Sequence, residues 1–125
     1  MMTGTVTTDG AAILRVTLFD ANGRPHDYDA VIDTGFNGTF TLPPAIIAAL
    51  GLRWFRYDTS TLADGSIVRF DVYRGVLLWD GQPLTILIDE MDSDSLIGMA
   101  LMHDYELNLP VRVGATFTLR PLPNP

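Results

Sequence analysis

The sequence contains no cysteine, which excludes disulfides, thiolate catalysis and cysteine metal sites. It also contains no apolar run close to the ~20 residues that a membrane-spanning helix needs. The first residues lack the basic segment and apolar run of a signal peptide, so we expect a cytoplasmic protein with no membrane partner. Basic residues are scarce, since 8 Lys and Arg face 15 Asp and Glu. The formal net charge of −7 therefore argues against nucleic acid as a partner.

The apolar content is sufficient for one core. The 125 residues suit a single domain, and 47% of them are hydrophobic, too many for a disordered chain. No internal repeat or linker divides the sequence. We therefore expect one domain over residues 1–120 and a proline-rich tail over residues 121–125. Pro121, Pro123 and Pro125 lack the amide hydrogen that a sheet requires.

Short apolar alternations separated by turns predict a mostly β fold. Residues 14–18 alternate between apolar and polar side chains, and Asn22-Gly23 is typical of a tight turn, so residues 12–32 are expected to form a hairpin. Similar patterns predict further extended segments over residues 39–42, 54–62, 67–73, 76–79, 84–88 and 111–119. Many short strands at this spacing are typical of a closed or folded β-sheet.

Helical signals are confined to two short segments. The segment from Pro43 to Leu50 begins with two prolines, and Gly51 follows it at the place of a left-handed C-terminal cap. A second, helix-like stretch runs from Met99 to His103. We therefore expect a mostly β domain with one or two short helices.

The stretch with the clearest chemical content runs from Ala30 to Gly38, where an apolar strand ends directly in Asp33-Thr34-Gly35. Two carboxylates that are held close together share a proton, so that one acts as a base toward water and the other as an acid. Gly35 permits a sharp turn and a close amide, and the Thr34 hydroxyl can lock the loop by hydrogen bonding. The same three letters also occur by chance as a polar turn after a strand.

Four features of the sequence follow one another in the order of a known family. They are a hairpin before Asp33-Thr34-Gly35, a strand and small helix ending at Gly51-Leu52, a hairpin tipped by Asp64-Gly65, and the element Ser95-Leu96-Ile97-Gly98. In this order the chain resembles the retropepsin-like aspartic peptidases, the single-domain relatives of retroviral proteases. The resemblance covers residues 14–107.

The resemblance implies a retropepsin-like acid-protease fold, with a flap hairpin, and the activity of an aspartic endopeptidase. Because the chain carries one Asp-Thr-Gly, a catalytic pair implies a homodimer in which Asp33 of both subunits activates a water. The implied partner is a peptide or protein substrate, with no metal or organic cofactor. The implied catalytic residues are Asp33, Thr34 and Gly35. The implied substrate-binding residues are Phe36, Asn37, Gly38, Asp64, Gly65, Ser66, Asp94 and Leu96.

Four positions depart from the family pattern. The family usually has alanine where this chain has Phe36, and acidic residues where it has Asn37 and Gly38. An arginine that often follows the second glycine is replaced by Met99. Phe36 can narrow the site or turn into the core. These changes favour an alternative, a binding or assembly module that kept the fold and lost turnover. A small β-barrel unrelated to peptidases is a third hypothesis.

The acidic residues Asp89, Glu90, Asp92 and Asp94 are expected to form an exposed loop, because their spacing does not match a calcium-binding EF-hand. By family position, residues 92–94 would lie near the rim of the substrate site. This placement predicts a preference for basic or neutral peptides.

The histidines and tryptophans carry no catalytic motif. His26 and His103 are isolated, so surface or capping roles are expected rather than a metal site. Trp54 and Trp79 lie in strand patterns and are expected in the core, with groove lining as the alternative.

Overall fold

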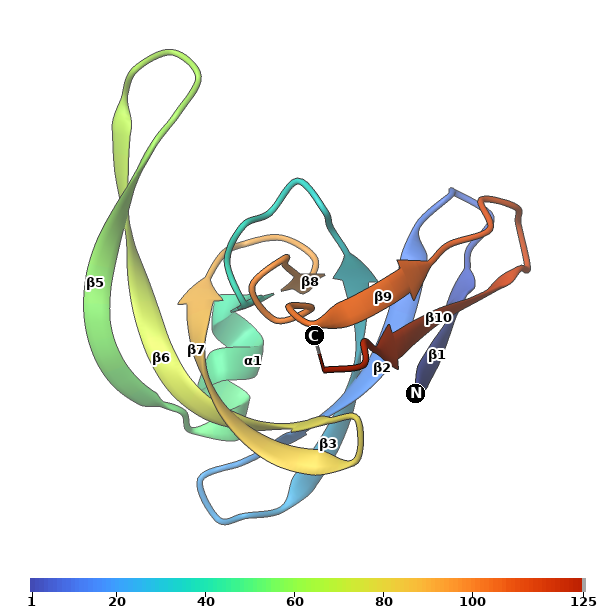
Figure 1. The fold of residues 1–125 in the computed structure, drawn as a ribbon. Helices are drawn as coiled ribbons and strands as arrows, with labels where there is room; N and C mark the ends of the chain where they lie inside the picture. The colour runs from blue at the N-terminus through green and yellow to red at the C-terminus, as the bar shows by residue number, and fades with distance from the viewer. Residues whose placement is uncertain (125) are drawn as a thin grey trace.

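The computed structural model describes residues 1–124, and over this range the chain is mostly β, with ten strands and one helix (Figure 1). The predicted mostly β class is therefore confirmed. Across residues 1–124 there is no helix with the length and apolar character that crossing a bilayer demands. The strands are β1 (Met2–Val6), β2 (Ala12–Phe19), β3 (Pro25–Ile32), β4 (Phe40–Leu42), β5 (Arg53–Thr61), β6 (Ile67–Trp79), β7 (Gln82–Glu90), β8 (Leu96–Ile97), β9 (Tyr105–Asn108) and β10 (Thr116–Pro121), and the helix is α1 (Pro44–Leu50).

Within residues 1–124 the strands form one mixed sheet in the order β5-β6-β7-β4-β8-β3-β2-β1-β10-β9. A further pairing joins β6 to β2, so that β6, β7, β4, β8, β3 and β2 close into a ring. The closed sheet that the turn-rich sequence predicts is present in this ring. β5 extends the sheet beyond the ring on one side, and β1, β10 and β9 extend it on the other (Figure 1).

The ring encloses the core because apolar side chains alternate along its strands. In β2, Leu14, Val16 and Leu18 are buried, while Arg15 and Thr17 between them are less so. Phe40, Ile88 and Ile97 come from three paired strands and are fully buried. Burying one such side chain contributes about 1.5–3 kcal/mol, so a slip in register would expose a large part of the core. The register of β3 against its neighbours, and hence the place where β3 ends, is fixed by this packing.

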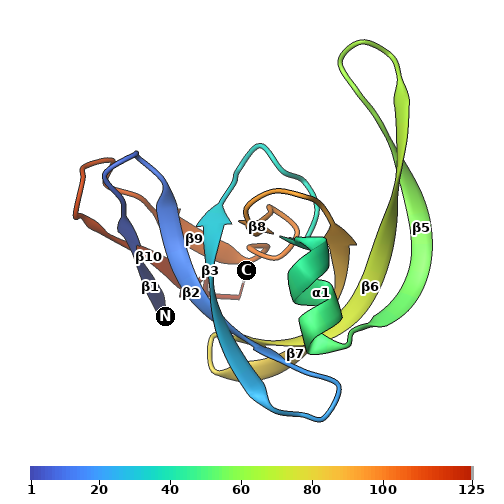
Figure 2. The ribbon, with the colours of Figure 1, turned by 180° about the vertical axis from the view of Figure 1, so that it is seen from behind.

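α1 lies between β3 and β6 in the view from behind (Figure 2). It begins at Pro44, whose ring suits the first turn, and it buries Ile47 and Leu50 against the core. Gly51 ends the helix with φ of 64°, and its amide bonds to the carbonyl of Ala48 at 3.1 Å. The predicted helix and its glycine cap are confirmed.

The segments predicted separately over residues 67–73 and 76–79 are one continuous strand, β6. Gly75 stays in the ladder opposite Ile86, so the chain does not break there. The first half of β6 pairs with β5 to form the hairpin predicted around Asp64-Gly65, which projects from the ring (Figures 1 and 2). The second half pairs with β7 and β2 and belongs to the ring.

The two tryptophans have different environments. Trp79 is 7% exposed and contacts Tyr105 edge-on, with 5.8 Å between ring centroids, so its expected core position is confirmed. Trp54 is 52% exposed on β5, and the expectation that it lies in the core is wrong. Every residue of its strand is exposed, and its indole N–H donates to Asp71 Oδ1 at 3.1 Å.

The last strand is shorter than the predicted segment 111–119, because β10 begins at Thr116. The preceding residues form a turn, in which Gly114 has φ of 80° and the amide of Ala115 bonds to the carbonyl of Arg112. Val111 is 81% exposed, so the apolar alternation there does not reflect burial.

Two strands absent from the sequence interpretation, β1 and β9, flank β10. β10 also includes Pro121, which pairs with Tyr105, so the sheet reaches one residue into the predicted tail 121–125. Leu122 continues the contact by donating its amide to the carbonyl of Asp104 at 2.8 Å. Pro125 lies outside the described residues.

The predicted helix-like stretch from Met99 to His103 is a single turn and not a helix. The amides of Leu101 and Met102 both bond to the carbonyl of Gly98, at 3.2 and 3.3 Å. The turn ends at once because Asp104 takes a left-handed φ of 65° and leads into β9.

Candidate active site

The site is built around the loop that follows β3. β3 pairs with β8 in parallel, and the amide of Asp33 bonds to the carbonyl of Ile97 at 2.9 Å just beyond the paired residues. The amide of Val31 bonds to the carbonyl of Ser95 at 2.8 Å on the same strand. These bonds continue the ladder up to Asp33, so its backbone is held by the sheet although it lies in a loop.

The Asp33 side chain is half-buried and faces back into its own turn. Its Oδ1 accepts a hydrogen bond from the amide of Gly35 at 2.9 Å. The amide of Phe36 bonds to the Asp33 carbonyl at 3.2 Å and closes the turn. A Cβ at Gly35 would lie 3.2 Å from Asp33 Oδ1, so glycine suits this close approach. Thr34 and Gly35 are exposed at the tip, and Asp33 itself remains partly exposed.

The other wall of the loop is a backbone contact between Gly38 and Gly98. The amide of Gly98 bonds to the carbonyl of Thr39 at 3.0 Å, and the amide of Ala100 bonds to the carbonyl of Gly38 at 3.1 Å. A Cβ on Gly98 would lie 2.0 Å from the Gly38 carbonyl oxygen. This position therefore requires glycine for space.

Phe36 turns its ring toward the same two glycines. A Cβ on Gly38 would lie 2.4 Å from Phe36 Cζ, and a Cβ on Gly98 would lie 2.6 Å from Phe36 Cδ2. The amide of Met99 bonds to the carbonyl of Phe36 at 2.8 Å and fixes the residue. The bulk of Phe36 and the missing side chain of Gly38 are thus two parts of one packing arrangement.

Thr41 connects β4 to the segment before β8, which pairs with the end of β3. It is fully buried, and its Oγ1 accepts the amide of Leu96 at 2.8 Å and donates to the carbonyl of Asp94 at 3.5 Å. This side chain ties β4 to the segment that enters β8. Leu96 is half-buried and Asp94 is exposed, and neither touches the cavity described below.

The hairpin of β5 and β6 ends in a tight turn on the same side of the molecule as the loop after β3 (Figures 1 and 2). Asp64 Oδ1 accepts the amide and the hydroxyl of Ser66 at 2.8 and 2.6 Å, which lowers the pKa of Asp64. Gly65 has φ of 84°, a value that favours glycine. Side chains along β5 and over the first three residues of β6 are exposed, and the Arg69 guanidinium lies 3.9 Å from the Tyr57 ring centroid.

A cavity of about 480 Å³ separates this hairpin from the loop after β3. Of the residues predicted to bind substrate, Phe36 lines it and the others do not. Asp89, on β7, lines it too, and sequence reasoning missed this role because the acidic run was interpreted as an exposed loop. That expectation is wrong for Asp89 and Glu90, which are half-buried in β7, and confirmed for Asp92 and Asp94. The lining residues are Phe36, Thr59, Ser60, Leu62, Val68, Arg69, Phe70, Asp89, Met91 and Asp92.

The electrostatic setting of Asp89 differs from that of the exposed acids. Burial raises the pKa of Asp89, the nearby charge of Asp58 adds to this rise, and Arg56 opposes it. Arg56 is itself 3.8 Å from an Asp58 oxygen. Among residues 1–124 no group donates a hydrogen bond to the Asp89 carboxylate.

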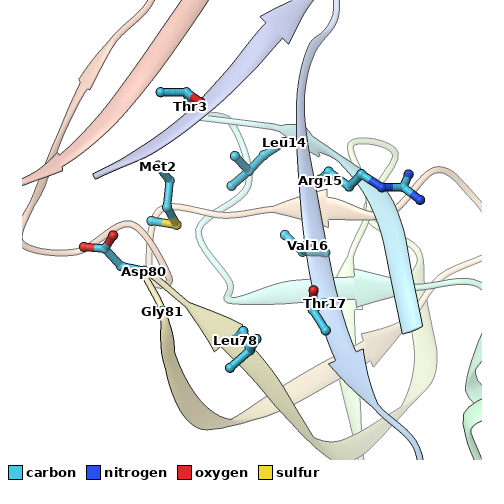
Figure 3. Close-up of a pocket in the computed structure, with 9 residues that line it drawn as sticks. All are labelled: Met2, Thr3, Leu14, Arg15, Val16, Thr17, Leu78, Asp80 and Gly81. Atoms are coloured by element: carbon cyan, nitrogen blue, oxygen red, sulfur yellow. The ribbon is translucent and has the colours of Figure 1, made fainter. Parts of the chain in front are cut away.

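A second cavity, of about 250 Å³, lies between β1, β2 and the turn after β6 (Figure 3). Asp80 at its edge accepts the Met1 amino group at 2.7 Å and the Tyr105 hydroxyl at 3.1 Å, and these bonds lower the pKa of Asp80. Arg15 extends away from the cavity and pairs with Asp29 at 3.1 Å. Asp80 and Arg15, the charged residues that line this cavity, both have partners already, so the cavity offers no free reactive group.

Metal chemistry has no cluster of ligands to use within residues 1–124, where no three His, Asp or Glu side chains converge. His26 and His103 are exposed, and each lies beside a neighbouring aspartate, at 2.8 and 3.5 Å, which confirms their expected surface positions.

Comparisons with protein-family models, with curated proteins and with solved structures give no match to this chain.

Proposed function

We propose that this chain has a retropepsin-like fold and is one half of a homodimeric aspartic endopeptidase. The observation that carries the proposal is the Asp33 turn, in which a carboxylate at the end of a core strand is fixed by the Gly35 amide at 2.9 Å. The turn is braced from behind by the β8 strand and Gly98. The projecting β5–β6 hairpin supplies a cover on the same side.

The chemistry requires a second carboxylate, and a second copy of the chain would supply it. In a two-fold dimer, Asp33 of each subunit lies next to the axis, and the two carboxylates share one proton. The ionised one takes a proton from a water held between them, and the protonated one donates to the carbonyl oxygen of the peptide bond. Thr34 and Gly35, which are exposed in the single chain, would then line the contact between subunits.

The hairpin would act as a flap. Its tip turn is closed by the hydrogen bond from the Ser66 amide to Asp64. β5 and the start of β6 are exposed, and the hairpin carries apolar side chains toward the cavity. Closing over a bound peptide would exclude water and cover these side chains. Activity is expected at mildly acidic pH and is lost when both members of the Asp33 pair ionise.

The test combines a peptide-cleavage assay from pH 4 to 7 with measurement of molecular mass in solution. Asp33→Asn should abolish cleavage and leave the dimer mass unchanged. Asp29→Asn, four residues earlier on the exposed face of β3, is the matched control and should cleave like the natural chain. Adding excess Asp33→Asn should suppress activity by forming mixed dimers with one carboxylate. A monomer at every concentration, or cleavage by Asp33→Asn, would contradict the proposal.

A binding or assembly module is the second candidate. The observation that favours it is the packing of Phe36 on Gly38 and Gly98, which leaves no room for a side chain at position 38. Position 37 carries asparagine, so neither position has an acidic side chain to hold a substrate backbone. Such a module would keep peptide binding in both natural chain and Asp33→Asn, and would cleave with neither.

A further inference from the structure

The cavity between the hairpin and the catalytic loop has the walls of a side-chain subsite. Its apolar lining comes from three segments. The loop contributes Phe36, the hairpin contributes Leu62, Val68 and Phe70, and the residue after β7 contributes Met91. Its volume of 480 Å³ falls within the range of about 300–1,000 Å³ that small-molecule sites occupy. These walls suit the hydrocarbon part of a long side chain.

The position of Asp89 within this cavity is fixed by strand pairing. Asp89 lies opposite Val72 on β6 and beside Thr41 on β4. Val72 and Thr41 are buried, so Asp89 is an acidic residue whose two neighbours across the sheet are both buried. Since side chains alternate along a strand, Ile88 faces the core and Asp89 faces the cavity.

Within residues 1–124 the Asp89 carboxylate forms no ion pair, although the charge of Arg56 acts on it. Arg56, across the sheet, lies within 4 Å of Asp58 and stacks near Phe55. Arg69, which also lines the cavity, lies over the Tyr57 ring. Both cations therefore have other contacts, and the neighbouring Asp92 adds negative charge to the cavity.

We propose that this cavity is the subsite for a basic substrate side chain, arginine or lysine, whose aliphatic stem contacts the apolar walls and whose charged end bonds to Asp89. Arginine and lysine place hydrocarbon against apolar surfaces while keeping a charged end at a polar group. A charge-assisted bond to a partly buried carboxylate is stronger than a neutral one. The raised pKa of Asp89 agrees with this assignment, because a bound cation would offset what burial costs the ionised carboxylate. The inference rests on the proposed function, since it treats the Asp33 loop as the centre of a peptide-binding groove.

The test uses one peptide in two forms, with arginine or with its neutral isostere citrulline at the position that a positional-scanning library selects. Binding is measured by calorimetry to the Asp33→Asn chain, which cannot turn over, and cleavage is measured with the natural chain. The arginine form should bind about tenfold more tightly than the citrulline form. Adding Asp89→Asn should remove the difference. Glu90→Gln, which changes the same charge on the adjacent residue outside the cavity, should keep it.

The outcomes separate the two proposals. Cleavage without an arginine preference, or a preference that survives Asp89→Asn, would overturn the subsite and leave the peptidase proposal standing. An arginine preference in binding that depends on Asp89, without cleavage by the natural chain, would support the subsite and refute the peptidase. Absence of both binding and cleavage would overturn both.

Discussion

Replacing Gly98 by alanine tests the backbone contact that supports the Asp33 loop. The added Cβ would lie 2.0 Å from the carbonyl oxygen of Gly38 and 2.8 Å from its carbonyl carbon. Neither atom can turn aside, because the Gly38 carbonyl accepts the amide of Ala100 at 3.1 Å. The two backbone segments therefore have to separate by about 1 Å or more to restore normal contact distances.

The loss in free energy of unfolding has two sources, overpacking at Gly98 and the lengthening of two backbone hydrogen bonds. Overpacking a well-packed site costs about 1–3 kcal/mol, and an obstacle made of backbone belongs at the upper end. The bonds from Gly98 to Thr39 and from Ala100 to Gly38 lengthen together, at a net cost of about 1 kcal/mol each. We therefore expect Gly98→Ala to lower the free energy of unfolding by about 5 kcal/mol. The Asp33 turn, which is bonded to the residue before Gly98, should be displaced as well.

The assay is urea denaturation followed by tryptophan fluorescence. Gly10→Ala is the control, because Gly10 has φ of 84° but no atom within 4 Å of its added Cβ. That change should cost about 1–2 kcal/mol through backbone strain alone. If Gly98→Ala loses no more than Gly10→Ala, the close approach of Gly98 and Gly38 is not a feature of the folded chain, and the loop is held by something else.

The remaining predictions address the neighbouring contacts and one ionisable group. Gly38→Ala should destabilise the fold, because the added Cβ meets the Phe36 ring, and Phe36→Ala should partly rescue it by removing that ring. A double-mutant cycle should give a coupling of about 1–2 kcal/mol, and strict additivity would contradict this contact. Thr41→Val should lower the free energy of unfolding by about 2 kcal/mol, because the Leu96 amide loses its acceptor. Thr41→Ser keeps the hydroxyl and should retain most of the stability. Equal effects of valine and serine in thermal melts would refute the role of the hydroxyl. Asp89→Asn should raise the free energy of unfolding at pH 7, because the pKa of Asp89 is raised in the fold and its ionised form opposes folding. The gain should vanish near pH 3, where aspartate is protonated in both the folded and the unfolded state. An equal gain at both pH values, measured by urea denaturation, would contradict the raised pKa.

The local parts of the site are readable in the sequence. An apolar strand that runs into Asp33-Thr34-Gly35 predicts a carboxylate in a tight turn, and the structure has that turn closed by the Gly35 amide. Asp64-Gly65 predicts the hairpin tip for the same reason, because turn chemistry is decided by residues within a few positions of one another.

Where the sequence interpretation is wrong, a neighbour distant in the chain is the cause. Asp89 lies in an acidic run that by composition is typical of an exposed loop, yet pairing with β6 and β4 places it in a half-buried strand. Trp54 has the pattern of a core residue, but its strand lies at the edge of the sheet with nothing packed over it. Val111 continues the apolar alternation of the last strand, but the turn at Gly114 separates it from β10.

The sequence by itself determined the hairpins, the helix with its Gly51 cap and the turn that presents Asp33, because side-chain alternation and turn residues act over a few bonds. The tertiary structure alone decided the closure of β6 on β2, the contact of Gly38 with Gly98 and the direction of Asp89. Each of these joins segments tens of residues apart, and their meeting depends on burial of the whole core rather than on any local preference.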